Sequence, residues 1–437
     1  MNRAASFALM TLAFGANAAL AELPAPLTDA DYVSVDPAEA RLGQLLFYDP
    51  ILSGNRNISC ASCHHPSLGT SDGLSLGLGE GATGLGAKRH VTLENTPEQR
   101  IPRNAPALFN LGAHEFTVLF HDGRIEVDPS RPSGLRTPMG AEMEEGFATL
   151  LSAQTMFPVL SPDEMAGHYG ENEVSKAVRT GIITGEGGAW DLIAARVRAI
   201  PEYEAMFAEA FPGRPITFTA ISDAVASFME AEWRSDGSPF DAHLRGEAPL
   251  TGAAAEGMAL FHGEAGCATC HSGPFQTDHS FHAAGAPQIG PGKAARFERH
   301  ARDTGRMRVT GDPADAYAFR TPSLRNVTRT GPWGHAGAHD DLRAFLLSHL
   351  DPDAEWPRPA LPALALAEDW RVADDPAERA AIRDAAIRAA PPETRPRLAA
   401  GDVDALMAFL AALDDPVALK GRAGIPDAVP SGLEVPR

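Results

Sequence analysis

Positive charge is scarce in this chain of 437 residues. Its 37 lysines and arginines face 57 aspartates and glutamates, which gives a formal net charge of -20 at pH 7. This charge argues against binding to nucleic acid or anionic membranes and favours a basic soluble partner, although solubility alone is the simpler explanation. Alternating strand patterns are also rare, and beyond the N-terminus no apolar run resembles a membrane helix.

Cysteine is rarer still: the chain has four, and each pair stands in a run Cys-x-x-Cys-His. The runs comprise Cys60, Cys63 and His64 in the first half and Cys267, Cys270 and His271 in the second. In such a run the two thiols attach covalently to a haem, and the histidine becomes an axial ligand of its iron. A redox dithiol, a zinc site or two disulfides would leave both histidines unexplained. The sequence therefore predicts two covalent c-type haems.

The N-terminus resembles an export signal. An apolar stretch over residues 4–20 ends in a small-x-small cleavage pattern, which predicts cleavage after Ala21 and a mature chain that starts at Glu22. An uncleaved anchor is the alternative, but the stretch is short for a span and contains Gly15 and Asn17. Export also suits covalent haem, which is normally attached outside the cytoplasm, so we expect a periplasmic protein.

The remaining length suits two domains, each of which buries one haem. A boundary is expected at residues 235–239, where a long helical pattern ends in Ser-Asp-Gly-Ser-Pro, giving domains 22–236 and 237–437. The 41 glycines and 36 prolines gather in long loops that a haem edge can order. Helical periodicity marks residues 38–48, 189–200, 217–233, 251–262, 338–350 and 402–413, so the fold class is mostly α.

Six stretches outside the haem runs carry a resemblance to a known family. They are 42–47 (LGQLLF), 103–108 (RNAPAL), 120–124 (FHDGR), 238–241 (SPFD), 321–327 (TPSLRNV) and 330–337 (TGPWGHAG). In this order around two haem runs, they resemble the bacterial di-haem cytochrome c peroxidases, which include the MauG-type enzymes. The resemblance covers nearly the whole mature chain. It implies two cytochrome-c-like domains with long loops and with the haems near the domain interface.

The resemblance also implies a peroxide pocket above the first haem. The family lines this pocket with a glutamine, a proline and a glutamate, and Gln154, Pro158 and Glu164 stand at the matching spacing. Glu164 is expected to move a proton between the two peroxide oxygens, and Gln154 to orient peroxide or a water. Without the family context, Glu164 would be read as a carboxylate that stabilises a helix start at Ser161.

The remaining axial positions follow from the same comparison. Family members that rest in an inactive form have a distal histidine where this chain has Leu78. Leucine cannot ligate iron. The first haem is therefore expected to be high-spin and to need no reductive change of ligand before it reacts. His90 is the nearest rival ligand. For the second haem the family uses methionine or tyrosine at the position of His349; a second imidazole would lower the potential. The alternative for His349 is a cation at a helix end.

Between the haems the family has a tryptophan and a calcium ion. His121 takes the tryptophan position, so the inter-haem path is expected to use Trp333 or solvent and propionates. The matching calcium ligands are Asn104, through its side chain, and Thr330 and Pro332, through backbone carbonyls; hard oxygen donors suit calcium. Asn104 could equally be a turn residue.

The expected function is reduction of hydrogen peroxide to water, with electrons that enter at the second haem from a small, basic c-type cytochrome or a similar donor. A MauG-like oxidase that matures a protein substrate is the main alternative, although that chemistry uses a surface tryptophan where this chain has Ala265. A plain di-haem electron carrier is a third reading, and a homodimer is left open. Segments 125–147 and 351–397 lengthen the chain relative to shorter family members and carry no recognisable catalytic constellation.

Overall fold

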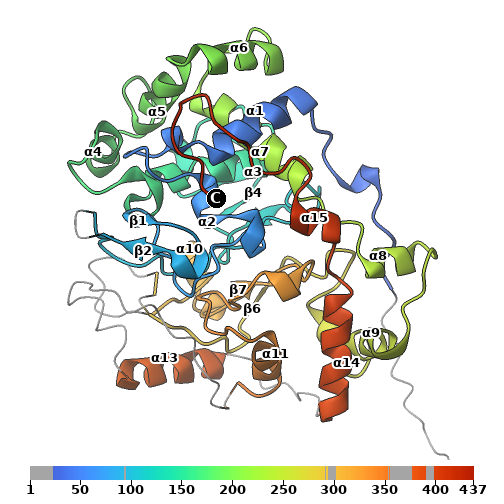
Figure 1. Ribbon diagram of the computed structural model, residues 1–437. Helices are drawn as coiled ribbons and strands as arrows, with labels where there is room; N and C mark the ends of the chain where they lie inside the picture. Colours follow the sequence, from blue (N-terminus) through green and yellow to red (C-terminus); the bar gives the residue numbers. More distant parts are fainter. Residues whose placement is uncertain are drawn as a thin grey trace, which may run out of the picture.

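The computed structural model describes residues 23–92, 95–290, 292–293, 302–352, 354, 376–389 and 398–437 (Figure 1). Within these residues the chain is mostly helical and has three small antiparallel sheets, so the expected class is confirmed. The expected leader, residues 1–21, and most of segment 351–397 lie outside the described residues. In the described part of the chain, no helix combines the length and apolar character needed to cross a membrane.

The first half forms a helical core around a close helix pair. Its helices are α1 (Pro37–Tyr48), α2 (Cys60–Cys63), α3 (Leu150–Thr155), α4 (Glu173–Thr180), α5 (Ala189–Arg198), α6 (Pro201–Ala210) and α7 (Phe218–Glu232). α1 packs directly on α7, and a Cβ at Gly43 would lie 1.8 Å from the Ala224 carbonyl oxygen. Only glycine permits this approach. The rings of Phe47, Phe228 and Trp233 fill the space beside the pair.

The second half has a smaller core of its own. Its helices are α8 (Pro239–Leu244), α9 (Gly252–His262), α10 (Met307–Thr310), α11 (Leu342–Leu350), α13 (Pro376–Ala389) and α14 (Ala400–Ala411). α9 and α14 pack as closely as the first pair, because Gly257 meets the Ala405 backbone. Phe240, Phe261 and Phe409 form the aromatic centre of this core.

Short sheets hold the loops that surround the haem runs. β1 (Ala82–Thr83) pairs with β2 (His90–Val91), and β6 (Phe281–His282) pairs with β7 (Phe319–Arg320). The third sheet has the order β3 (Val118–Leu119), β4 (Ile125–Val127), β5 (Leu135–Arg136). Its last two strands form a hairpin from the segment that lengthens the chain after Arg124.

The C-terminal residues return to the first half. After α14 the chain forms α15 (Pro416–Lys420), and Ala418, Val429 and Val435 join the first core. Figure 1 shows the C-terminus among the helices of the first half. The side chain of Gln44 on α1 donates to the Gly424 carbonyl oxygen at 2.7 Å. The two halves are therefore tied together by the end of the chain as well as by their interface.

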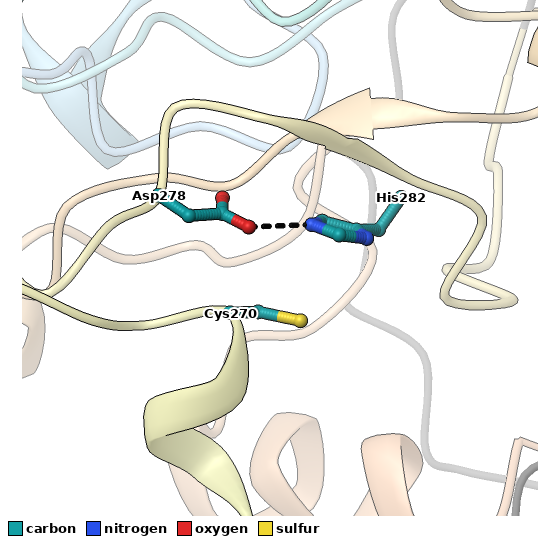
Figure 2. Close-up of side chains that lie close together, drawn as sticks. All are labelled: Cys270, Asp278 and His282. Atoms are coloured by element: carbon teal, nitrogen blue, oxygen red, sulfur yellow. Dashed lines mark hydrogen bonds and ion pairs between the residues drawn. The ribbon is translucent and has the colours of Figure 1, made fainter. Parts of the chain in front are cut away.

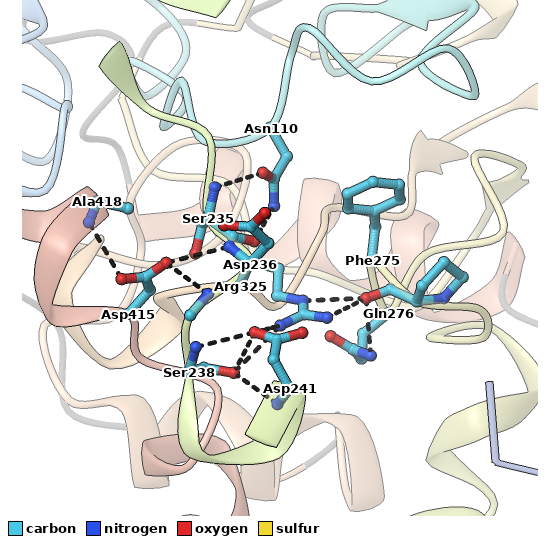
Figure 3. A network of polar contacts seen from close by, with 12 residues as sticks. Asn110, Ser235, Asp236, Ser238, Asp241, Phe275, Gln276, Arg325, Asp415 and Ala418 are labelled. Carbon is cyan, nitrogen blue, oxygen red and sulfur yellow. Dashed lines mark hydrogen bonds and ion pairs between the residues drawn. The ribbon is translucent and has the colours of Figure 1, made fainter. Parts of the chain in front are cut away.

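A buried polar network fixes the segment expected to divide the domains (Figure 3). Arg325 and Asp241, both with fully buried side chains, form an ion pair at 2.7 Å. Asn110, from the first half, accepts a hydrogen bond from the Ser235 backbone at 2.6 Å. Asp415 accepts hydrogen bonds from two backbone amides of the same segment at 2.9 and 3.0 Å. Hydrogen bonds between buried polar groups of this kind favour one arrangement of the chain.

Five of the six expected helices are found within two residues of their bounds. The sixth, expected over 338–350, begins at Leu342, because Asp341 caps its N-terminus and Trp333 pairs with His339 in the turn before it. The helices that were not expected are α2, α3, α4, α6, α8, α10, α13 and α15. α4 has only eight residues and α6 only ten, so both depend on packing against the first core for their stability.

Candidate active site

The first Cys-x-x-Cys-His run forms the short helix α2, and His64 follows directly after its last residue. At the start of α2, the backbone NH of Ser59 donates a hydrogen bond to Ser62 Oγ at 3.0 Å. The Nδ1 of His64 lies 2.9 Å from the Thr70 carbonyl oxygen. This contact places the proton on Nδ1 and leaves Nε2 for a metal. Burial lowers the pKa of His64, so the ring is neutral, which is the form that ligates iron.

The second run repeats this arrangement. The Nδ1 of His271 lies 3.1 Å from the Gln276 carbonyl oxygen, which again leaves Nε2 free to ligate. Burial, and then the charge of His349, lowers the pKa of His271 to about 4. Both expected axial histidines are thus neutral and oriented by a backbone carbonyl, as haem ligation requires.

The four cysteines are present as separate thiols. None of the four is in a disulfide. Burial raises the pKa of Cys60 to about 12 and that of Cys267 to about 11, so both are neutral thiols in the protein without haem.

A possible metal cluster lies beside the second run. Figure 2 shows Cys270 close to Asp278 and His282, whose ligand atoms all lie within 4.8 Å of one another. Asp278 Oδ2 and His282 Nε2 form an ion pair at 2.7 Å. Because the second run is expected to attach a haem through Cys270, a metal there would compete with that attachment. We therefore read Asp278 and His282 as an ion pair beside the second run.

His349 lies where a second axial ligand is expected. It sits in the last turn of α11, and its Nδ1 lies 2.9 Å from the Phe345 carbonyl oxygen. Its charge lowers the pKa of His271, so the two imidazoles lie within electrostatic reach of one another. His339, which the motif comparison did not select, is buried, and neither ring nitrogen has a hydrogen-bond partner. His349 is exposed and His339 is buried, so both remain candidates for the second axial ligand.

The distal side of the first haem run has an apolar candidate and a histidine candidate. Leu78 is fully buried beside Leu74 and Ala82. His90 is exposed on β2, and its ring nitrogens lie 3.2 Å from Thr83 Oγ1 and 3.1 Å from the Lys88 carbonyl oxygen. Because those contacts engage both nitrogens, His90 is not free to act as a ligand in this arrangement.

The three expected pocket residues come from three consecutive turns. Gln154 lies on α3, Pro158 opens the next turn (Pro158–Leu160), and Glu164 lies in the turn Pro162–Ala166. Burial raises the pKa of Glu164 to about 7, and the charge of Arg124 opposes this effect. The charge of Glu164 in turn raises the pKa of Cys63. Glu164 therefore lies near the first haem run, with a proton affinity suited to acid/base work at neutral pH.

Two of the three expected calcium ligands, Asn104 and Pro332, are in contact across the joint between the halves. Asn104 is buried, its Nδ2 lies 2.6 Å from the Pro332 carbonyl oxygen, and its Oδ1 has no partner. A half-turn of the carboxamide would place both oxygens side by side. Thr330 is two residues away from Pro332 in the same turn. A buried oxygen without a partner beside a carbonyl fits a hard cation such as calcium.

His121 and Trp333 are the residues expected on the path between the two haems. The Nε2 of His121 lies 3.1 Å from the Asn104 carbonyl oxygen, and burial lowers the pKa of His121 to about 3. The indole NH of Trp333 donates to the Val327 carbonyl oxygen at 2.9 Å. His121 is therefore neutral and held by the segment that carries the expected calcium ligand.

Arg124 is a residue that the motif comparison did not assign to the pocket. It entered only as part of the FHDGR marker, and its action on Glu164 depends on two segments that are 40 residues apart in the sequence. No local pattern predicts such a long-range electrostatic effect.

Comparison with known proteins identifies a family and several relatives of this chain. A family model described as di-haem cytochrome c peroxidase matches residues 37–249. The methylamine utilization protein MauG of Methylorubrum extorquens is 32% identical over 314 residues, 71% of this chain and 68% of that protein. The cytochrome c551 peroxidase of Nitrosomonas europaea is 29% identical over 342 residues, 77% and 81% of the two chains. The crystal structure of a MauG-like protein associated with microbial copper homeostasis matches with TM-score 0.57 and 25% identity, over 93% of this chain and 97% of that one.

The site and these relatives define an oxidoreductase of the peroxidase type with c-type haems. The chain belongs to the di-haem cytochrome c peroxidase family, as the sequence motifs predicted. The relatives include both cytochrome c peroxidases and MauG.

Proposed function

We propose that the protein is a periplasmic peroxidase that reduces hydrogen peroxide to water with electrons from a small, basic c-type cytochrome. The observation that carries this proposal is Glu164, a half-buried carboxyl group whose pKa is raised to about 7 beside the first haem run. An electron carrier has no need for such a group at an iron without a second protein ligand.

Glu164 has the proton chemistry that peroxide cleavage needs. The haems, when bound, supply the electron transfer, and the overall reaction takes two electrons and two protons to convert hydrogen peroxide to two waters. Glu164 in its carboxylate form accepts a proton from one peroxide oxygen and delivers it to the other, which leaves as water. Gln154 orients the peroxide through its carboxamide. Pro158 forms the part of the pocket wall between Gln154 and Glu164.

The second half has the features of an electron entry domain. His271 and His349 would hold the second haem iron on both sides, which leaves no face for peroxide. Calcium held by Asn104, Thr330 and Pro332 would fix the joint between domains 22–236 and 237–437. Electrons would pass this joint near Trp333 and the neutral His121.

The net negative charge supports a basic electron donor, and the N-terminal sequence pattern supports a periplasmic location. A net charge of -20 attracts a basic donor and raises its rate of encounter at low ionic strength. Residues 1–21 have the features of a cleaved export signal.

A MauG-like oxidase is the second candidate, since the methylamine utilization protein MauG is 32% identical. Ala265, at the position of the surface tryptophan expected for that chemistry, is buried in the second core and offers no oxidisable side chain to a docked protein.

The test is turnover by the haem-loaded protein with hydrogen peroxide and reduced small c-type cytochrome. A peroxidase oxidises two cytochromes for each peroxide through many cycles. The peroxidase assignment would be rejected if peroxide were consumed without oxidation of the cytochrome. It would also be rejected if cytochrome oxidation stopped after a single turnover. Stronger cytochrome oxidation at low salt would support a basic donor.

A further inference from the structure

Arg89 is a buried cation that contacts the first haem run. The residue is only 4% exposed. Its Nη1 donates to the Ser62 carbonyl oxygen at 2.5 Å and lies 3.7 Å from Cys63 Sγ. Its Nη2 donates to the Gly79 carbonyl oxygen at 2.7 Å. The guanidinium is therefore held between α2 and the loop that contains Leu78.

No direct ion pair neutralises the charge of Arg89 within the described part of the chain, and its buried Nε has no hydrogen-bond partner. The two buried carboxyl groups of the neighbouring loop have other partners. Asp72 accepts a hydrogen bond from the Leu74 backbone NH at 3.0 Å, and Glu80 accepts hydrogen bonds from three asparagine side chains. Because an arginine in a protein keeps its proton, the positive charge remains.

The loop that receives this guanidinium is fixed against the turn Pro162–Ala166. The Glu80 backbone NH donates to the Asp163 carbonyl oxygen at 2.8 Å. A Cβ at Gly79 would lie 1.9 Å from the same oxygen, an approach that only glycine permits. Arg89 is thus bound at both ends of its guanidinium to fixed backbone, and its charge stays beside the haem-attachment helix.

The corresponding sulfur of the second run has different neighbours. The ligand atoms of Asp278 and His282 lie within 4.8 Å of Cys270 Sγ. These two residues pair with each other, and their side chains are 20% and 43% exposed. Solvent screens such a pair, and its two partners oppose one another. The first run therefore meets a buried net charge, whereas the second meets a partly exposed pair.

A fixed positive charge favours the ferrous state of a haem, because reduction removes one positive charge from the iron. We propose that Arg89 raises the reduction potential of the first haem through the charge that it holds against Cys63. This inference rests on haem attachment at the first run and does not require the proposed role of Glu164. A higher potential there favours transfer of an electron from the second haem to the iron expected to meet peroxide.

The test is a redox titration of the haem-loaded protein followed by electron paramagnetic resonance, which reports the ferric signal of each haem separately. Arg89→Gln should lower the equilibrium constant for reduction of the first haem by roughly tenfold, or about 59 mV for a one-electron couple. Arg89→Lys keeps the charge and should retain most of the wild-type potential. The potential of the second haem should not change in either variant.

The matched control is Lys88→Gln, which removes the same charge from the adjacent, exposed residue. It should leave both potentials unchanged, because water and salt screen an exposed charge. Absorption spectra show whether each variant carries two haems. If Arg89→Gln attaches less haem, Arg89→Met takes its place, because its apolar side chain can follow the path of the arginine stem.

The proposal would be overturned if the neutral variant kept the wild-type potential of the first haem, or if both potentials fell equally. It would also be overturned if Arg89→Lys lowered the potential as much as Arg89→Gln, since a purely structural link would depend on the guanidinium fork and not on its charge. The titration is done without peroxide, so its result is independent of turnover. A protein that shows the expected shift but fails the cytochrome assay would lose the peroxidase assignment and keep the role of Arg89.

Discussion

Replacement of Glu164 by glutamine keeps the size of the side chain and removes its ability to exchange a proton. The carboxyl group has a pKa of about 7 because burial disfavours its charged form. Its carboxylate is the form that accepts the peroxide proton, so activity should rise as pH increases through this value. Below it the group is protonated and cannot start the reaction.

The size of the effect follows from the fraction of Glu164 that is ionised. With a pKa of about 7, roughly one in ten groups is a carboxylate at pH 6 and roughly nine in ten at pH 8. The wild-type rate with hydrogen peroxide should therefore rise by nearly tenfold over these two pH units. A general acid/base group contributes about 10²–10⁴-fold to rate, so Glu164→Gln should be slower by that factor at pH 8 and nearly independent of pH.

The assay is single-mixing stopped flow of oxidised, haem-loaded protein with excess hydrogen peroxide between pH 5.5 and 8.5, a range of about three units around the group's pKa. Glu173→Gln is the control, because Glu173 is a surface carboxylate paired with Arg196 and lies outside the pocket. A Glu164→Gln variant that reacts within about twofold of the wild type, with the same pH profile, would refute the reasoning.

Three further changes test other parts of the structure. Arg325→Met leaves the carboxylate of Asp241 buried without its partner and should lower the free energy of unfolding by about 3–5 kcal/mol in guanidinium titrations; a loss below about 1 kcal/mol, the size for a surface pair, would contradict the network. His349→Met should raise the potential of the second haem in spectroelectrochemical titrations, because methionine ligation favours the ferrous state. An unchanged low-spin spectrum in that variant would assign the ligand to His339. Asn104→Ala should release bound calcium, measured by elemental analysis, and slow electron transfer between the haems; a calcium content equal to wild type would remove Asn104 from that site.

Local patterns predicted the haem attachment points and most helices. A Cys-x-x-Cys-His run specifies its chemistry within five residues, and amphipathic helices such as α5 bury residues at helical spacing along one face. The six cysteine and histidine positions of the two runs could therefore be placed without knowledge of the fold. The family resemblance added Gln154, Pro158 and Glu164, which no local pattern would select.

Contacts between distant segments could not be predicted in this way. Arg103 meets Asp303 across 200 residues, and Arg306 meets Glu126 across 180. Such pairs form only when both halves have folded, and each partner alone resembles an ordinary surface charge in the sequence. The same reason explains why the buried His339 was not anticipated: its burial comes from the packing of the turn before α11.

The central claim is that one haem iron keeps an open face for peroxide while the other is held by histidines on both sides. Electron paramagnetic resonance of the oxidised protein, before and after addition of hydrogen peroxide, tests it most directly. The account predicts one high-spin signal, which peroxide removes, and one low-spin signal typical of two imidazole ligands. Two low-spin signals that do not respond to peroxide would contradict it.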